Sequence, residues 1–176
     1  RSNLTQLVQI QNNSNILIQS LELNLYLNRT FDLIHNLKNK NEVVIINTIP
    51  DGVFVDFNPA YLESVLLNFT TNAIKYSNPD KPIEIKYSFS IENDKKTLRI
   101  SDNGLGIDLK KHGDSLFGMY KTFHKHKDSH GLGLYITKNQ IESMKGTVSV
   151  ESEVGLGTTF IIVFNDSLQE ELAGLD

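Results

Sequence analysis

The sequence contains no cysteine, which excludes disulfide frameworks, thiolate zinc sites and cysteine nucleophiles together. Tryptophan is absent as well, although nine Phe and six Tyr supply aromatic bulk. No apolar run approaches the ~20 residues that a membrane-spanning helix needs. Basic residues are outnumbered, with 17 Lys and Arg against 21 Asp and Glu, and the formal net charge of −4 argues against a broad nucleic-acid-binding surface.

The composition that remains is that of an ordinary globular domain. The 176 residues are 39% hydrophobic and 22% charged, which is enough apolar material for one core and corresponds to a single domain. Because the sequence begins at Arg1 without a methionine or a targeting segment, we expect it to be a piece of a longer protein.

Hydrophobic periodicity and turn residues predict three helices and a set of hairpin-linked strands. The helices are expected from Ser20, as N-cap, to about Lys40, from Pro59 to about Tyr76, and from Leu132 to Met144. This pattern predicts the α+β class, with one mixed, mostly antiparallel sheet and the helices on one face. The strands are expected at Glu42–Ile49, Val53–Val55, Pro82–Ile91, Lys95–Ser101, Thr147–Glu151 and Thr158–Phe164.

The second predicted helix carries a polar stripe beside its apolar stripe. At ~100° per residue, Asn72 lies about 40° from Asn68, and Lys75 lies about 20° from it on the other side. An asparagine oxygen suits a hard cation such as Mg²⁺, whose other ligands are usually water and phosphate oxygens. A chain this rich in asparagine also places some on helix surfaces without a function, so the spacing alone leaves both interpretations open.

A loop of unusual length, residues 102–130, begins with one glycine-containing segment and is followed by another. In Asp102–Ile107, two glycines let the backbone approach a flat ligand, and the carboxylate can accept a hydrogen bond from an exocyclic amine. Gly131–Leu134 opens a helix, where free N–H groups and the dipole bind anions, and a lysine-rich segment that includes Lys121 precedes it. The alternatives are a tight turn with a solvated Asp, and turning glycines beside solvated lysines.

The five histidines do not form a metal-binding pattern. His124, His126 and His130 are spaced in a way that suits a tetrahedral site poorly, so a solvated loop is the preferred interpretation. We expect His35 at the surface of the first helix.

Five polar or glycine-rich segments follow one another along the chain: Asn68–Tyr76 (NFTTNAIKY), Asp102–Ile107 (DNGLGI), Leu116–His124 (LFGMYKTFH), His130–Leu134 (HGLGL) and Gly155–Phe160 (GLGTTF). In this order they resemble the N, G1, F and G2 boxes and the final glycine–threonine motif of one family, the ATP-binding catalytic domains of two-component sensor histidine kinases in the GHKL ATPase superfamily. The resemblance extends from about residue 20 to residue 164. It implies a two-layer α/β sandwich of the GHKL (Bergerat) type with a long ATP lid.

The resemblance implies roles at the phosphate end of bound ATP. Asn72 would coordinate the Mg²⁺ that bridges the phosphates, and Asn68 would lie beside it in the phosphate site. Lys75 would face the phosphates or ribose, and Tyr76 would lie along the adenine. Asn68 and Lys121, the latter near the γ-phosphate, are the residues expected to act in catalysis.

It also implies roles at the adenine end. Asp102 would accept a hydrogen bond from the adenine amino group, which selects against guanine because guanine presents a carbonyl oxygen there. Gly104 and Gly106 would let the backbone close on the base, with Ile107 beside them. Thr159 would support the base pocket through its hydroxyl.

The remaining implied contacts belong to the lid and the helix that follows it. Residues from about 108 to 130 would form the lid, and Phe123 would pack it down. Backbone amides at Gly131 and Gly133 would meet the phosphates. Leu132 and Leu134 are expected to belong to the same nucleotide-binding segment.

No histidine here has the sequence context of the family's phosphoacceptor, so the acceptor is expected outside this chain. Residues 1–19 would be the tail of the dimerisation helix and a linker, residues 20–165 the catalytic domain, and residues 166–176 a C-terminal tail. The resemblance implies ATP and Mg²⁺ as ligands. As partners it implies the protein's own dimerisation and phosphoacceptor domain and a response-regulator receiver domain, with no nucleic acid and no direct membrane contact by this fragment. The implied location is cytoplasmic, with the alternative that the parent protein is anchored in a membrane.

Alternative functions remain at this point. One is another GHKL enzyme, such as an anti-sigma serine kinase, a topoisomerase subunit or a chaperone ATPase. Lys75 and Tyr76 after the second asparagine favour the histidine kinase, and Asn68 stands where topoisomerases and chaperones usually have a catalytic glutamate. The others are a nucleotide-binding scaffold without kinase activity and a pure interaction domain.

Overall fold

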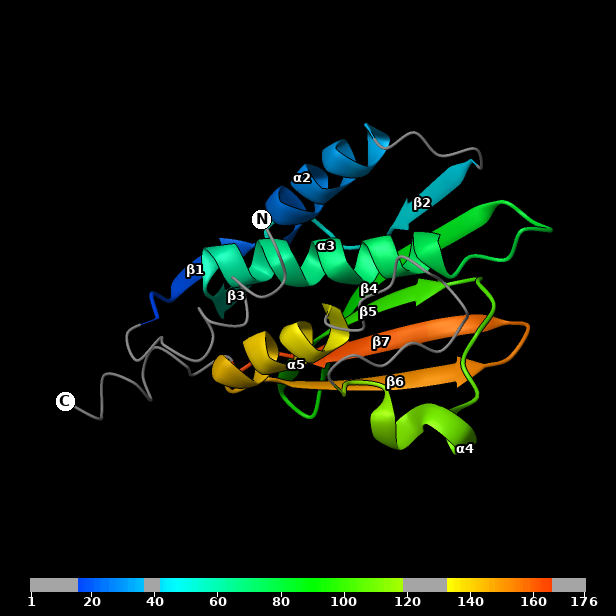
Figure 1. The fold of residues 1–176 in the computed structure, drawn as a ribbon. Helices are drawn as coiled ribbons and strands as arrows, with labels where there is room; N and C mark the ends of the chain where they lie inside the picture. Colours follow the sequence, from blue (N-terminus) through cyan, green and yellow to red (C-terminus); the bar gives the residue numbers. More distant parts are fainter. Residues whose placement is uncertain (1–15, 37–41, 119–132, 166–176) are drawn as a thin grey trace.

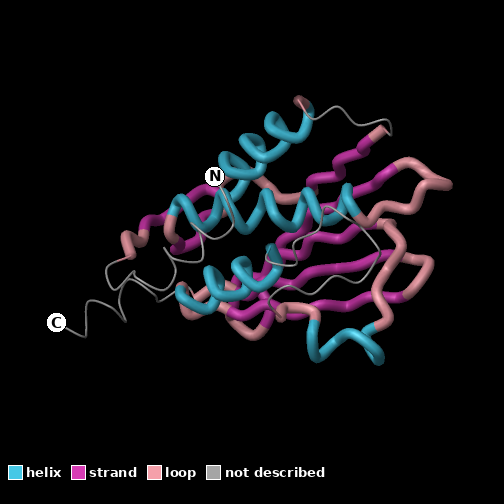
Figure 2. The backbone as a smooth tube through the Cα atoms, in the orientation of Figure 1, coloured by secondary structure: helices cyan, strands magenta, loops and turns pink. Residues whose placement is uncertain are grey.

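A β-sheet and a layer of helices make up the structure, a computed structural model that describes residues 16–36, 42–118 and 133–165 (Figures 1 and 2). The main sheet has five strands in the order β2-β4-β5-β7-β6. β2 runs parallel to β4, and every other neighbouring pair is antiparallel. The strands are β2 (Val43–Asn47), β4 (Ile83–Glu92), β5 (Lys95–Asp102), β6 (Thr147–Glu153) and β7 (Gly157–Val163).

Three helices cover one face of this sheet: α2 (Leu23–His35), α3 (Pro59–Lys75) and α5 (Gly133–Ser143). The predicted α+β fold, with a mixed, mostly antiparallel sheet and helices on one face, is therefore confirmed (Figure 2). Among the described residues, no helix combines the length and the apolar character that crossing a membrane requires.

Shorter elements complete the described structure. β1 (Gln19–Glu22) and β3 (Phe54–Phe57) form a separate antiparallel pair beside the N-terminal end of α3 (Figure 1). After β5 the chain forms α4 (Leu109–His112) and a single 3-10 turn (Gly113–Ser115). These two short elements lie within residues 102–130, which the sequence predicted to be a loop.

The prediction for the first helix is wrong at its start. Ser20 is not an N-cap, because it lies in β1 opposite Asp56 of β3. The helix begins only after Glu22, whose side chain accepts a hydrogen bond from the Gly52 N–H instead of capping the helix. Pairing with a strand more than 30 residues away overrides the local helical pattern. The helix ends at His35, short of the predicted end near Lys40, which lies outside the described residues.

The core lies between the sheet and the three helices. Phe69 of α3 stacks on Phe160 of β7, with ring centroids 4.6 Å apart. Along β5, Leu98 and Ile100 are buried under the helices. Because side chains alternate along a strand, the next residue on this face is Asp102, the last residue of β5. A carboxyl group therefore ends a row of apolar side chains.

Candidate functional site

The Asp102 carboxyl is held at the end of β5 by two backbone donors. Its Oδ1 accepts from the Gly104 N–H at 2.9 Å and from the Thr158 N–H at 3.3 Å. Burial raises the pKa of this carboxyl from 3.8 to about 6, although the two hydrogen bonds act in the opposite direction. Both bonds go to Oδ1, so Oδ2 keeps its full capacity to accept from a donor outside the fold.

The loop after Asp102 is built against two other elements. A Cβ at Gly104 would lie 2.6 Å from the Tyr76 carbonyl oxygen, and a Cβ at Gly106, where φ is +75°, would lie 2.1 Å from the Glu153 carbonyl oxygen. Both glycines are therefore required for the protein's own packing, independently of any ligand. The Ile107 N–H donates to Ser152 Oγ at 2.8 Å, so its backbone is held by β6.

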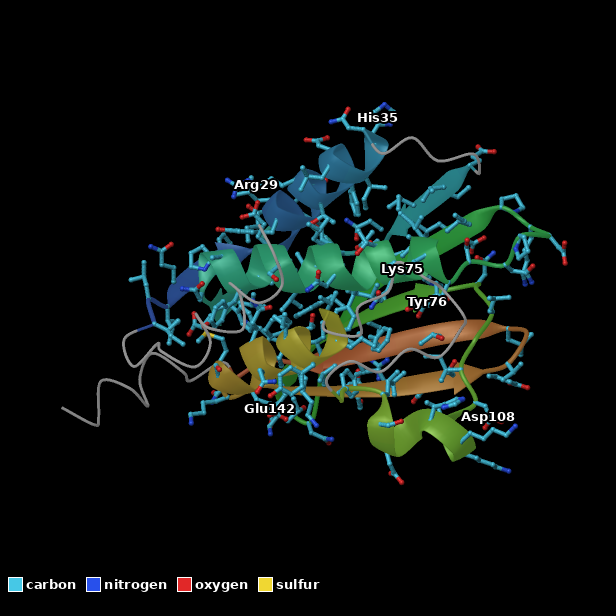
Figure 3. All side chains as sticks on the ribbon, in the orientation of Figure 1. Arg29, His35, Lys75, Tyr76, Asp108 and Glu142 are labelled. Atoms are coloured by element: carbon cyan, nitrogen blue, oxygen red, sulfur yellow. The ribbon has the colours of Figure 1, made fainter. Side chains whose placement is uncertain are left out.

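The C-terminal end of α3 lies against the same loop. The Tyr76 carbonyl accepts from the Leu105 N–H at 3.0 Å, so the end of α3 and the segment after β5 are tied together. Tyr76 is partly buried and Lys75 is exposed. Figure 3 shows Lys75 and Tyr76 at this end of α3, whereas His35 lies on the outer end of α2, exposed as predicted.

The two asparagines of the polar stripe lie on the side of α3 that runs beside α5. Asn68 Nδ2 donates to Thr137 Oγ1 of α5 at 3.1 Å. Asn72, one turn further along, is partly buried, and its side-chain amide has no hydrogen bond to any described residue. An amide oxygen without a partner suits a cation or a ligand donor.

The first described residue of α5 is Gly133, and a Cβ there would meet no described atom within 4 Å. Leu134 is partly buried and packs against the core. Four predicted site residues of this region lie outside the described residues: Lys121, Phe123, Gly131 and Leu132.

Part of the segment that resembles the F box is described. Leu116 is 1% exposed, and the Phe117 ring meets Phe160 edge to face at a centroid distance of 6.3 Å. Lys138 Nζ lies 5.6 Å from the centroid of the Phe117 ring. This end of the loop is thus anchored on the core beside α5.

The structure does not bring Thr159 to the Asp102 carboxyl. Register pairs Thr159 with Ser101, and the two hydroxyls are 2.8 Å apart. Because faces alternate along a strand, both lie on the face away from the helices. Thr158 lies opposite Asp102, is buried, and forms a hydrogen bond with Ser152 through its hydroxyl.

Sequence reasoning passed over both Thr158 and Ser152. Thr158 lies two residues before Phe160 and four before Ile162 in β7, so the alternation of side chains along a strand places it on the same buried face. Nothing local marks Ser152, whose position follows from the hairpin register.

A metal site built from His, Cys, Asp or Glu side chains is not present in the part of the chain that the structure describes. Within it, no group of three or more His, Cys, Asp or Glu is placed to hold an ion. Any cation bound here would take most of its ligands from water or from a bound anion, which is the usual situation for Mg²⁺.

The sequence of this chain matches one protein family and several known proteins. The sequence profile of the family described as histidine kinase-, DNA gyrase B- and HSP90-like ATPases matches residues 57–168. The sensor protein kinase WalK of Staphylococcus aureus is 30% identical over 166 residues, which cover 92% of this chain and 27% of WalK. This chain thus spans about a quarter of the length of that relative.

Solved structures share the fold. The histidine kinase AdeS of Acinetobacter baumannii superposes with a TM-score of 0.75 at 20% identity, over 93% of this chain and 75% of that chain. The catalytic domain of the histidine kinase ThkA, in a nucleotide-free form, gives 0.70 at 19% identity, over 86% of this chain and 99% of that chain. Because the family profile matches well over half of its residues, the chain belongs to the histidine kinase-, DNA gyrase B- and HSP90-like ATPase family, as a catalytic ATP-binding domain of the sensor histidine kinase type.

Proposed function

We propose that this chain binds ATP with Mg²⁺ and transfers the γ-phosphoryl group to a histidine on a dimerisation domain, from which it passes to an aspartate of a response regulator. The acceptor domain and the receiver domain are partners outside this chain. The chain spans only 27% of WalK. The activity and the location of the whole protein are therefore inferred from the relatives' names and from the site described above.

The Asp102 carboxyl is the observation that carries the proposal. Its Oδ1 is occupied by two backbone donors, and Oδ2 is left as an acceptor in a partly buried position. The exocyclic amine of adenine is a donor and satisfies this oxygen. Guanine presents a carbonyl oxygen at the same position, and two acceptors facing each other in a desolvated site are unfavourable.

The phosphate end of the proposed site lies between α3 and α5. Asn72 carries a side-chain amide that has no hydrogen bond to any described residue, and Gly133, the first described residue of α5, has no side chain that could cover the first turn of the helix. Hard neutral oxygens and helix N–H donors fit Mg²⁺ and phosphate respectively. Bound Mg²⁺ would neutralise the phosphate charge, and Asn68 and Asn72 would orient the ion. The roles of Lys121, Phe123, Gly131 and Leu132 remain predictions.

Kinase activity is favoured over the other functions of the family for two reasons. WalK, the relative at 30% identity, is named a sensor protein kinase. At the position where topoisomerases and chaperones usually carry a catalytic glutamate, this chain has Asn68, which cannot act as a base.

Titration calorimetry with ATP, GTP and ATP plus EDTA tests the nucleotide site. We expect ATP to bind, GTP to bind at least tenfold more weakly, and EDTA to weaken ATP binding. The matched pair of variants is Asp102→Asn, expected to lose the preference for ATP, and Asp32→Asn on the exposed side of α2, expected to retain it. Absence of ATP binding by the unmodified chain contradicts the proposal.

A second experiment tests phosphoryl transfer. The chain is mixed with a separately supplied dimerisation and phosphoacceptor module and ATP labelled at the γ-phosphate. We expect acid-labile phosphohistidine on the module, and none when Asn72→Ala replaces the unmodified chain. Asn28→Ala, an exposed asparagine of α2, is the control. ATP binding without transfer to any such module would favour a nucleotide-binding scaffold instead.

A further inference from the structure

Two consecutive hydrogen bonds connect α3 to the first residue of α5. Thr137 Oγ1 donates to the Gly133 carbonyl oxygen at 2.7 Å. The hydroxyl oxygen of Thr137, Oγ1, in turn accepts a hydrogen bond from Asn68 Nδ2 at 3.1 Å. Thr137 is 0% exposed, whereas its two partners, Asn68 and Gly133, are partly buried.

The proton of the Thr137 hydroxyl decides which way the Asn68 amide faces. A carbonyl oxygen only accepts, so the single hydroxyl proton goes to Gly133. The lone pairs that remain on Thr137 Oγ1 accept only, and an amide N–H must therefore face them. With Nδ2 directed at α5, Asn68 Oδ1 is turned away from Thr137.

No described residue occupies the Asn68 side-chain oxygen. It makes no hydrogen bond to a described residue, and the buried side-chain atoms without a partner in the described part of the chain are Ser64 Oγ and Gln140 Oε1 only. Within the described part of the chain, Asn68 Oδ1 is thus not a buried oxygen without a partner. A flipped amide would instead offer N–H donors, which repel a cation and attract a phosphate oxygen.

The helix geometry places this oxygen next to the proposed phosphate end. α3 and α5 run antiparallel, side by side (Figure 1). One turn from Asn68 towards the C-terminus of α3 is Asn72, and one turn from Thr137 towards the N-terminus of α5 is Gly133. The two bonds thus connect the asparagine stripe to the start of α5.

We propose that Thr137 is a positioning residue that holds the Asn68 amide with its oxygen towards the metal–phosphate end of bound nucleotide. This inference rests on the proposed function. It assigns a role to a residue that no motif of the sequence singles out and whose hydroxyl bonds Asn68 and the Gly133 carbonyl. Its effect is specific to the metal-dependent part of binding, because the adenine end is held separately by Asp102.

The test compares Thr137→Val, which keeps the shape and removes the hydroxyl, with Thr137→Ser, which keeps the hydroxyl. Affinity for a non-hydrolysable ATP analogue is measured with Mg²⁺ and with EDTA. We expect Thr137→Val to lower the affinity in Mg²⁺ roughly 10-fold or more, as for other residues that orient a metal ligand. Affinity in EDTA stays within about twofold, and Thr137→Ser restores the Mg²⁺ value.

A control variant matches the chemistry closely. Thr30 of α2 is also a buried threonine whose hydroxyl donates to the carbonyl four residues earlier, that of Tyr26, at 3.0 Å. Thr30→Val removes the same kind of bond away from the site, and we expect no change in the Mg²⁺ dependence. A thermal melt of each variant shows that it is folded.

A double-variant cycle gives a second readout, which remains informative if Thr137→Val is unstable. In an Asn68→Ala background, Thr137→Ser and Thr137→Ala should have the same Mg²⁺ dependence, since there is no amide left to orient. The inference is overturned if Thr137→Val retains the Mg²⁺ dependence, or if affinity falls equally with and without the metal. Absence of nucleotide binding by the unmodified chain overturns the proposed function itself.

Discussion

Replacing Asp102 with asparagine is expected to stabilise the nucleotide-free protein at neutral pH. The ionised carboxylate is partly buried at the end of an apolar row, and burial penalises the charged form. Asparagine keeps an oxygen acceptor for the Gly104 and Thr158 N–H groups and removes the charge. The residue proposed to select adenine is therefore one that costs stability.

The magnitude follows from the pKa of Asp102, which rises from 3.8 to about 6 on folding. The difference of about 2.2 units corresponds to about 3 kcal/mol at ~1.36 kcal/mol per unit. Between these two values the folded state binds more protons than the unfolded state, so stability falls as the pH rises. The stabilisation is fully present below pH ~4 and is lost above pH ~6.

Urea unfolding of the wild type and of Asp102→Asn at intervals from pH 4 to pH 8 measures this effect. We expect the variant to be more stable by about 1–3 kcal/mol at pH 7.5, and equal to the wild type near pH 4. Asp32→Asn, an exposed position, should show no such trend. Equal stabilities at pH 7.5, or an advantage that grows towards pH 4, would refute the reasoning.

Three further predictions concern the stability of the fold and are measured by urea or thermal unfolding. Gly106→Ala should lower the free energy of unfolding by more than about 2 kcal/mol, because it combines a positive φ with a clash against the backbone. Gly52→Ala, at φ +83° in open space, should lower it by only about 1 kcal/mol. Equal losses in the two variants would contradict the packing argument. Tyr87→Phe should cost about 1–2 kcal/mol because it leaves the buried hydroxyl of Thr70 without its partner, and a neutral result would be inconsistent with that bond. Glu92→Gln should leave the free energy of unfolding unchanged, because the ion pair of Glu92 with Arg99 is exposed to solvent. This is expected even though Arg99 lowers the pKa of Glu92 to about 2. A clear loss of stability would show that the ion pair stabilises the fold.

Local sequence determined the features that depend on neighbours along the chain. The 3.6-residue period and the Asn58–Pro59 start define α3, and with it the angular relation of Asn68 to Asn72. The strands on either side of the turn at residues 93–94 are likewise marked by their own composition. The order of these segments was sufficient to indicate the family.

Tertiary structure decided what depends on pairing between distant segments. Residues 19–22 form a strand because Phe54–Phe57 is available to pair with them. A shift of one residue in register exchanges the faces of a strand, so the register of β7 against β5 places Thr158 rather than Thr159 beside Asp102. Thr137 acquires its partner from α3, 69 residues earlier. Local periodicity carries no information on such contacts, because they form only when the helices and the sheet pack together.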